Sequence, residues 1–242
     1  MLVVAALVPD TVLLVPGAGG TSDPASGLRE AALRAVGEVT ASGVRSIVVV
    51  APGGGVDRVI AGTVRTTLGA AGIPDGLLGW PVVEVQVDGV GSDSPGAPVV
   101  VALHLLARTG WGGALRIVEV TSATAPDGLA DLGADLVGTE PTGMVVVGSG
   151  SGRHGPDAPL ADDPRAPDHD ARVLADLADA DPAARARLAA DDPALADELA
   201  VRGWAPWQVL VGAAGDATVR ARTLAASTDL GAQHAVLLWD AR

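Results

Sequence analysis

Short, valine-rich apolar runs constrain the fold of this chain more than any other feature. Five such runs lie at residues 3–8, 46–50, 82–87, 115–120 and 144–147, and Gly, Pro or Asp lies near an end of each. Nearly continuous apolar runs of this length are typical of strands that are buried on both faces. Such strands need a covering layer on each side, so the runs favour a sheet within an α/β protein.

Helical spacing appears between the runs. In residues 26–41 the side chains of Leu28, Ala32, Val36 and Val39 fall on one stripe, and the charged residues lie elsewhere. Residues 99–108 and 126–137 behave in the same way, and the second of these segments begins with a proline in its first turn. Alternating strands and helices predict a mainly parallel sheet covered by helices on both faces. We expect one domain that spans residues 1–242.

The last third of the chain is expected to be mostly helical. Residues 168–214 contain the steps Asp181-Pro182 and Asp192-Pro193, and each places a helix cap before a proline at the first helical position. This pattern predicts three short helices, followed by a closing pair of strands at residues 219–224 and 235–239. Residues 16–26, 51–55, 88–98 and 148–167 are rich in Gly, Pro and Asp and are expected to be loops.

Composition excludes several classes of function. The chain has no cysteine, which excludes disulfides and thiolate chemistry and fits a cytoplasmic protein. Its formal charge of −13 argues against nucleic-acid binding and against anionic membrane surfaces. No apolar run approaches the roughly 20 residues of a membrane span, and residues 1–8 lack the basic start of a signal peptide. Twelve carboxylates against four arginines in residues 157–198 predict a solvated acidic surface, with a partner-binding surface as the alternative.

The carboxyl ends of the predicted strands indicate where a ligand would bind. In open parallel sheets, ligands collect beyond these ends, which here are residues 9–10, 51–53, 88, 121–122 and 149–154. The polar candidates at this edge are Asp10, Ser149, Ser151, Arg153 and His154. Glycines at 148, 150 and 152 would allow backbone N–H groups to turn toward an anion.

His154 is the histidine with the most functional context, because it ends the glycine-serine loop after a buried strand. His104 is expected to be a packed or partly exposed helix residue. His169 lies at a helix start where Asp168 is the expected cap, and His234 has no local partner in the sequence. No pair of these histidines has a metal-ligand spacing such as H-x-x-x-H.

Of two common enzyme motifs, the dinucleotide-binding motif is matched only by its glycine spacing, and the nucleophile elbow of serine hydrolases is missing. Gly150, Gly152 and Gly155 satisfy G-x-G-x-x-G, but Pro156 follows where a dinucleotide fold would start a helix. No G-x-S-x-G nucleophile elbow occurs, so the sequence gives little support to a serine hydrolase.

Four short pieces, in order along the chain, resemble a known family. They are Val8-Pro9-Asp10, Ala51-Pro52-Gly53, Ser149-Gly150-Ser151-Gly152-Arg153-His154, and Trp207 followed by an apolar stretch to Gly212-Ala213. Together they resemble the catalytic β-type subunit of the class III extradiol ring-cleaving dioxygenases, relatives of protocatechuate 4,5-dioxygenase, in a superfamily that includes the Memo-type proteins.

The resemblance implies an iron centre, and this chain departs from it at the ligands. In the family, two histidines and a later carboxylate hold Fe(II), and the histidine of Ser-Gly-x-x-x-His is an acid/base group, a role that would fall to His154. Asp10 stands in place of the first histidine ligand and Gly53 in place of the second. The expected carboxylate falls near Arg202-Gly203, and the nearest acid is Glu198.

Two main hypotheses follow from these departures. The first is a non-catalytic homologue without a cofactor, which uses the cleft to bind a small molecule or a protein. The second is an Fe(II)-dependent ring-opening dioxygenase with Asp10 as a substitute ligand and His154 moving protons. A hydrolase that pairs Ser149 or Ser151 with His154 is a third interpretation. Formation of a homo-oligomer stays open.

Overall fold

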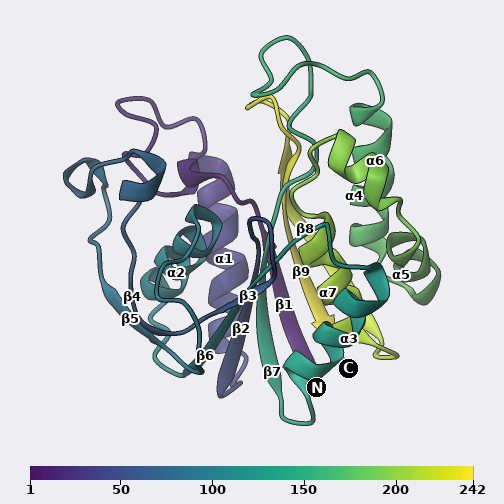
Figure 1. Cartoon of the computed structure of the whole chain (residues 1–242), viewed down its shortest axis with the longest axis horizontal. Coiled ribbons are helices and arrows are strands. Elements are labelled where there is room, and N and C mark those ends of the chain that lie inside the picture. Colours follow the sequence, from purple (N-terminus) through teal and green to yellow (C-terminus); the bar gives the residue numbers. More distant parts are fainter. Residues whose placement is uncertain (242) are drawn as a thin grey trace.

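Four of the valine-rich runs form the parallel centre of one sheet. The computed structural model describes residues 1–241. The strands β1 (Leu2–Val8), β2 (Ser46–Pro52), β6 (Ala114–Val120) and β7 (Thr142–Val147) lie in the order β6-β2-β7-β1 and are parallel (Figure 1). Antiparallel strands β3 (Arg58–Ile60) on one side, and β9 (His234–Ala241) and β8 (Val219–Ser227) on the other, extend the sheet to seven strands. The predicted α/β fold with a mainly parallel central sheet is confirmed.

Helices cover both faces of the sheet and create two cores. Helices α1 (Ser26–Ala41) and α2 (Ala97–Arg108) lie on one face, as Figure 1 shows. The other face carries α3 (Pro126–Val137), α4 (Ala166–Asp179), α5 (Pro182–Ala189), α6 (Pro193–Glu198) and α7 (Trp204–Ala214). Along β1, the side chains of Val4, Ala6 and Val8 enter the first core, whereas Ala5 and Leu7 enter the second. This alternation explains why the strand sequence is apolar at almost every position.

Residues 82–87 do not form a strand of the central sheet, and that prediction was wrong. Strand β5 (Glu84–Val87) pairs with β4 (Gly62–Arg65) in a separate two-stranded antiparallel sheet. Glu84 and Gln86 are exposed and Val87 is buried, which is the alternation of a one-sided strand. The predicted placement of Asp88 fails for the same reason. Asp88 exchanges hydrogen bonds with Leu115, near the amino end of β6, at the opposite edge of the sheet from the other candidates.

The helical region contains four helices instead of the predicted three. Asp181 and Asp192 cap α5 and α6 as expected, since their carboxylates accept hydrogen bonds from the backbone N–H groups of Ala184 (2.6 Å) and Ala194 (2.9 Å). Helix α4 starts earlier than expected, at Ala166, so Asp168 lies in its first turn and is not its cap. Short 3-10 turns occupy Val12–Leu14, Gly69–Ala71 and Asp75–Leu77.

The length and apolar character of the helices within residues 1–241 show whether any of them could cross a membrane. None of them combines the length and the apolar character that crossing a bilayer requires.

Candidate functional site

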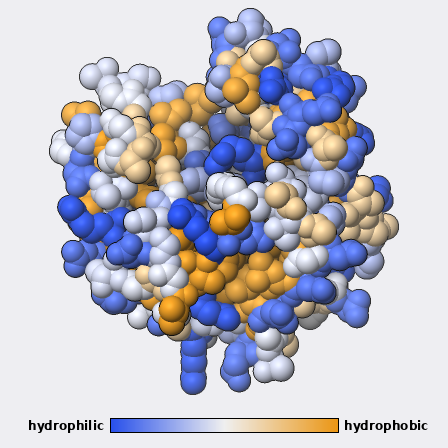
Figure 2. Space-filling view, viewed as in Figure 1, coloured by the Kyte–Doolittle hydropathy of each residue, from blue (hydrophilic) through white to orange (hydrophobic). Residues whose placement is uncertain are grey.

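A cleft lies beyond the carboxyl ends of the parallel strands. It has a volume of about 380 Å³. Its polar lining includes Asp10 and Thr11 after β1, Ser149 after β7, Arg202 before α7 and His234 at the start of β9. A second hollow of about 440 Å³ continues it toward the ends of β2 and β6, because Leu160, Ala200 and Arg202 line both. The space-filling view is recessed at this end of the molecule, between the two groups of loops (Figure 2).

Within this cleft the hydroxyl of Ser149 contacts the imidazole of His234. The Ser149 Oγ to His234 Nδ1 distance is 2.8 Å, and the two residues are 85 positions apart in the chain. Strand β9 lies beside β1, which in turn lies beside β7, so sheet order alone brings them to one edge. Burial lowers the pKa of His234 below its ordinary value, and the nearby Asp10 carboxylate opposes that shift. His234 is therefore a neutral imidazole at pH 7.

Backbone hydrogen bonds fix the chain at Ser149 and at the next residue, Gly150. The Ser149 carbonyl accepts a hydrogen bond from Gly203 N–H (2.7 Å), and the next amide, of Gly150, donates to Gln233 O (2.8 Å). A Cβ on Gly148 would lie 2.4 Å from Gly203 Cα, and one on Gly150 would lie 2.8 Å from Asp170 Oδ2. Only glycine fits at these two positions, and the serine between them is held in a fixed place.

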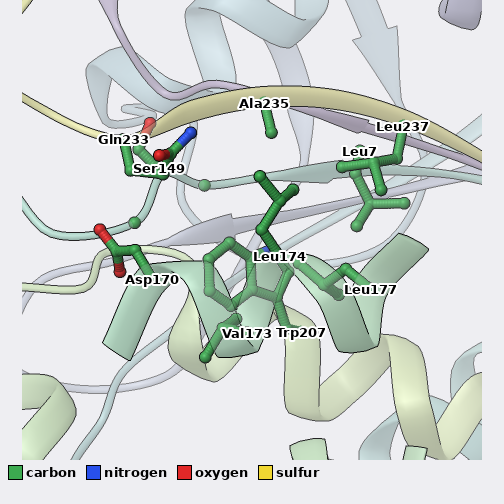
Figure 3. Close-up of a pocket in the computed structure, with 12 residues that line it drawn as sticks. Leu7, Ser149, Asp170, Val173, Leu174, Leu177, Trp207, Gln233, Ala235 and Leu237 are labelled. Carbon is green, nitrogen blue, oxygen red and sulfur yellow. The ribbon is translucent and has the colours of Figure 1, made fainter. Parts of the chain in front are cut away.

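Behind Ser149 is a small apolar void, shown in Figure 3. Its volume of about 20 Å³ is close to the space of one water molecule. Leu7, Leu174, Leu177 and Leu237 lie along it, whereas Ser149, Asp170 and Gln233 gather at one end (Figure 3). A ligand of several atoms can therefore approach Ser149 only from the cleft.

Asp10 is paired with an arginine from a distant part of the chain. Its carboxylate accepts a hydrogen bond from Arg202 Nε, and the two residues are 192 positions apart. The Asp10 side chain is 10% exposed, whereas that of Arg202 is 52% exposed. The backbone N–H of Asp10 also points toward Ser149 Oγ at 3.4 Å. Two of the candidates named from the sequence, Asp10 and Ser149, are thus brought together.

His154 does not contact this pair and belongs to a separate network of histidines and carboxylates. Its Nε2 lies 2.6 Å from Asp170 Oδ2, Asp170 Oδ1 lies 3.2 Å from His169 Nδ1, and His169 Nε2 lies 3.2 Å from Asp191 Oδ2. The hydrogen bond to Asp170, and then the one to Asp191, raise the pKa of His169 to about 9. His169 is thus a buried cation between two carboxylates. This network attaches the loop after β7 to α4 and to the segment after α5.

Ser151 and Arg153 serve the same loop. Ser151 is fully buried, donates its hydroxyl to Leu199 O (2.6 Å) and accepts a hydrogen bond from Arg153 N–H (3.2 Å). The guanidinium of Arg153 donates to Ala161 O at 3.0 Å. Both residues therefore hold the loop in shape, and neither lines the cleft. His104 is likewise structural, since it is buried in α2 beside Trp80, as expected for a packed helix residue.

The residues at the expected iron positions do not fit a site with two histidines and one carboxylate. The Asp10 carboxylate is taken by Arg202, and Gly53 offers no ligand atom. A Cβ at Gly53 would lie only 3.0 Å from Glu119 Cβ, and Glu119 itself is buried and bound to Arg58 and to the Gly96 amide. Across residues 1–241 no three His, Asp or Glu side chains are grouped to hold a metal.

Sequence reasoning missed His234 and Arg202 as members of the cleft. His234 has no partner nearby in sequence, and Arg202 attracted attention only as a position that lacks a carboxylate. The signal that could have found His234 was its place at the amino end of a predicted closing strand. An antiparallel strand that joins the sheet places its first residue at the edge where its parallel neighbours end.

Comparisons with known proteins show the fold of this chain. No protein-family model matches it, and no curated protein has a similar sequence. Among solved structures, the uncharacterized protein JW3007 from Escherichia coli K12 is similar, with a TM-score of 0.51 and 13% identity over 98% of this chain and 99% of that one. At this identity, the likeness establishes that the two proteins share an architecture along their whole length, and nothing beyond it.

Proposed function

We propose that this protein is a class III extradiol dioxygenase-like homologue that lacks the standard non-haem Fe(II) site and binds a small organic molecule in its cleft. The observation that carries the proposal is the pairing of Asp10 with Arg202. It places a guanidinium against the one carboxylate that stands at an expected ligand position. The placement of Asp10, Gly53 and Ser149 after the neighbouring strands β1, β2 and β7 supports the resemblance of scaffold.

Arg202 also indicates the chemistry of the ligand. Only its Nε has a hydrogen-bond partner among the described residues, so both Nη groups are free to donate. Its side chain is half exposed and lines both parts of the cleft. A guanidinium with free N–H groups in one plane favours a carboxylate or carbonyl oxygen. The ligand is therefore a small molecule that carries such a group.

Metal content and ring cleavage test the first half of the proposal. Purified protein should contain iron and zinc well below one equivalent. Anaerobic titration with Fe(II), followed by protocatechuate and air, should give no yellow ring-cleavage product. One equivalent of bound Fe(II) together with a yellow product would instead support the alternative, a dioxygenase that uses Asp10 and His154.

Ligand binding tests the second half. Benzoate, followed by saturation-transfer NMR, should bind the wild-type protein. Arg202→Gln should weaken binding about 10- to 100-fold, the loss expected for hydrogen bonds to a charged group. Arg220→Gln removes an exposed arginine on β8, away from the cleft, and should leave benzoate binding unchanged. Equal binding by the wild type and Arg202→Gln would refute this role of the cleft.

A further inference from the structure

The Ser149–His234 contact has the geometry of a nucleophile and its base. The 2.8 Å separation is a hydrogen bond between a hydroxyl and an imidazole nitrogen. No hydrogen bond is made by His234 Nε2 within residues 1–241. In the neutral tautomer with the proton on Nε2, the lone pair of Nδ1 accepts the hydrogen bond from the Ser149 hydroxyl. Both residues line the cleft, although Ser149 is only 4% exposed. The pair is thus reachable by small molecules alone.

We propose that Ser149 and His234 act as a catalytic dyad that hydrolyses small carboxylic esters bound in the cleft. The inference deepens the proposed function, because it rests on the cleft accepting a carbonyl compound and names the class. It differs from the hydrolase suggested by the sequence, in which His154 was the base. His154 is bound to Asp170 in the buried network and does not line the cleft.

The reaction needs only water as a co-reactant. Ser149 Oγ attacks the ester carbonyl carbon while its proton moves to His234 Nδ1, which forms a tetrahedral oxyanion. The C–O bond to the alcohol then breaks, and the same proton passes to the leaving oxygen. Water attacks the acyl-serine with His234 again as base, and this step releases the carboxylic acid and restores Ser149. No oxidant or reductant is involved.

The surroundings support charge separation in this reaction. Burial lowers the pKa of His234, so a neutral base is present at pH 7, and the Asp10 carboxylate favours the imidazolium that forms. Thr11 and Gly152 line the cleft, and the backbone N–H of neither residue donates a hydrogen bond among the described residues. Together with the free N–H groups of Arg202, they are the donors available to an oxyanion.

Covalent labelling gives the most direct test. Diisopropyl fluorophosphate should modify the wild-type protein once per chain, as measured by intact mass, and p-nitrophenyl acetate should be hydrolysed. Ser149→Ala should abolish both reactions, and His234→Ala should slow labelling at least about 100-fold. Ser94→Ala is the matched control, because Ser94 is exposed, lies outside the cleft and has no imidazole partner, and it should react like the wild type.

The absence of cysteine from the chain allows a second measurement. Ser149→Cys introduces a single thiol beside His234. Transfer of the thiol proton to the imidazole would give a thiolate–imidazolium pair, which should lower the apparent thiol pKa below the usual value of about 8.5. The rate of iodoacetamide alkylation against pH should then be half-maximal below pH 7.5. The single thiol of Ser94→Cys, and that of Ser149→Cys combined with His234→Ala, should show ordinary or higher pKa values.

These results separate the dyad from the binding cleft. Labelling that persists in folded Ser149→Ala would overturn the inference. So would an unreactive wild type whose Ser149→Cys thiol titrates like that of Ser94→Cys. If benzoate still bound through Arg202 in either case, the proposed cleft function would stand and only the dyad would fail. If benzoate binding failed while Ser149 was labelled, the dyad would stand on its own.

Discussion

Two imidazole networks meet the loop that follows β7, and they differ in what each imidazole can reach. His234 has one neutral partner, Ser149, and lines an open cleft. His154 belongs to a chain with Asp170, His169 and Asp191 that is buried under the loop. The histidine with the more prominent sequence context is the one whose imidazole is bound to a buried carboxylate and does not line the cleft. A histidine motif therefore indicates an anchored loop as readily as a catalytic group. The hydrogen-bond partner of the imidazole, and whether the residue lines the cleft, separate the two.

Removing the central carboxylate of the buried network should have the largest effect on stability. Asp170 is 1% exposed in its side chain and accepts hydrogen bonds from His154, His169 and the Ser151 amide. Asp170→Ala should lower the free energy of unfolding by about 3–5 kcal/mol, since it leaves a buried cation with one partner fewer. Urea denaturation measures this. Asp168→Ala, an exposed position in the same helix turn, should stay within about 0.5 kcal/mol of the wild type.

The two networks should also respond to pH in opposite directions. The pKa of His169 is raised from 6.5 to about 9, so its stabilisation is complete below pH 6.5 and is lost as the pH rises from 6.5 through 9. The pKa of His234 is lowered from 6.5, so its contribution is lost as the pH falls below 6.5. Melting temperatures from pH 6 to 10 should fall less in His169→Gln than in the wild type. Parallel curves would contradict the buried cation.

Gly150 lies between the two networks, so a substitution there should affect both the stability of the buried network and the reactivity of Ser149. A Cβ on Gly150 would lie 2.8 Å from both Asp170 Oδ2 and Gln233 Cβ, the residue before His234. Gly150→Ala should therefore cost about 1–3 kcal/mol of unfolding free energy and slow the labelling of Ser149. Gly152→Ala, whose Cβ would lie 3.5 Å from Pro159 Cγ, should leave the unfolding free energy nearly unchanged. If the two variants were equally stable, the loop would be looser than the structure indicates.

The smallest stability effect should come from the ion pair over the cleft. Arg202 is half exposed, so Arg202→Gln should change the unfolding free energy by no more than about 1 kcal/mol, although the same substitution is expected to weaken benzoate binding. Chemical denaturation beside the benzoate titration checks this. A loss of unfolding free energy well above about 1 kcal/mol would mean that Arg202 stabilises the fold, and would contradict a role limited to ligand binding.

Local pattern was enough for most of the elements. The run at 144–147 is apolar because β7 is buried on both faces, and α3 occupies the residues that its spacing predicted, 126–137. The run at 82–87 misled, because Val83, Val85 and Val87 alternate with polar residues in a strand that one side of a small sheet covers. The alternation with Glu84 and Gln86 is the local signal that distinguishes this run from the continuous apolar runs of the central sheet.

The sequence by itself determined the α/β class, the positions of the core strands and the presence of polar residues after them, because these depend on periodicity and on breakers within short windows. Only the tertiary structure decided which of those residues meet. Ser149 reaches His234 because β9 joins the sheet beside β1. Asp10 meets Arg202 because the segment just before α7 is held at the same edge, where the Gly203 N–H donates to Ser149 O. These contacts join residues 85 and 192 positions apart. Strand order sets the first and the packing of the segment before α7 sets the second, and no local pattern encodes either.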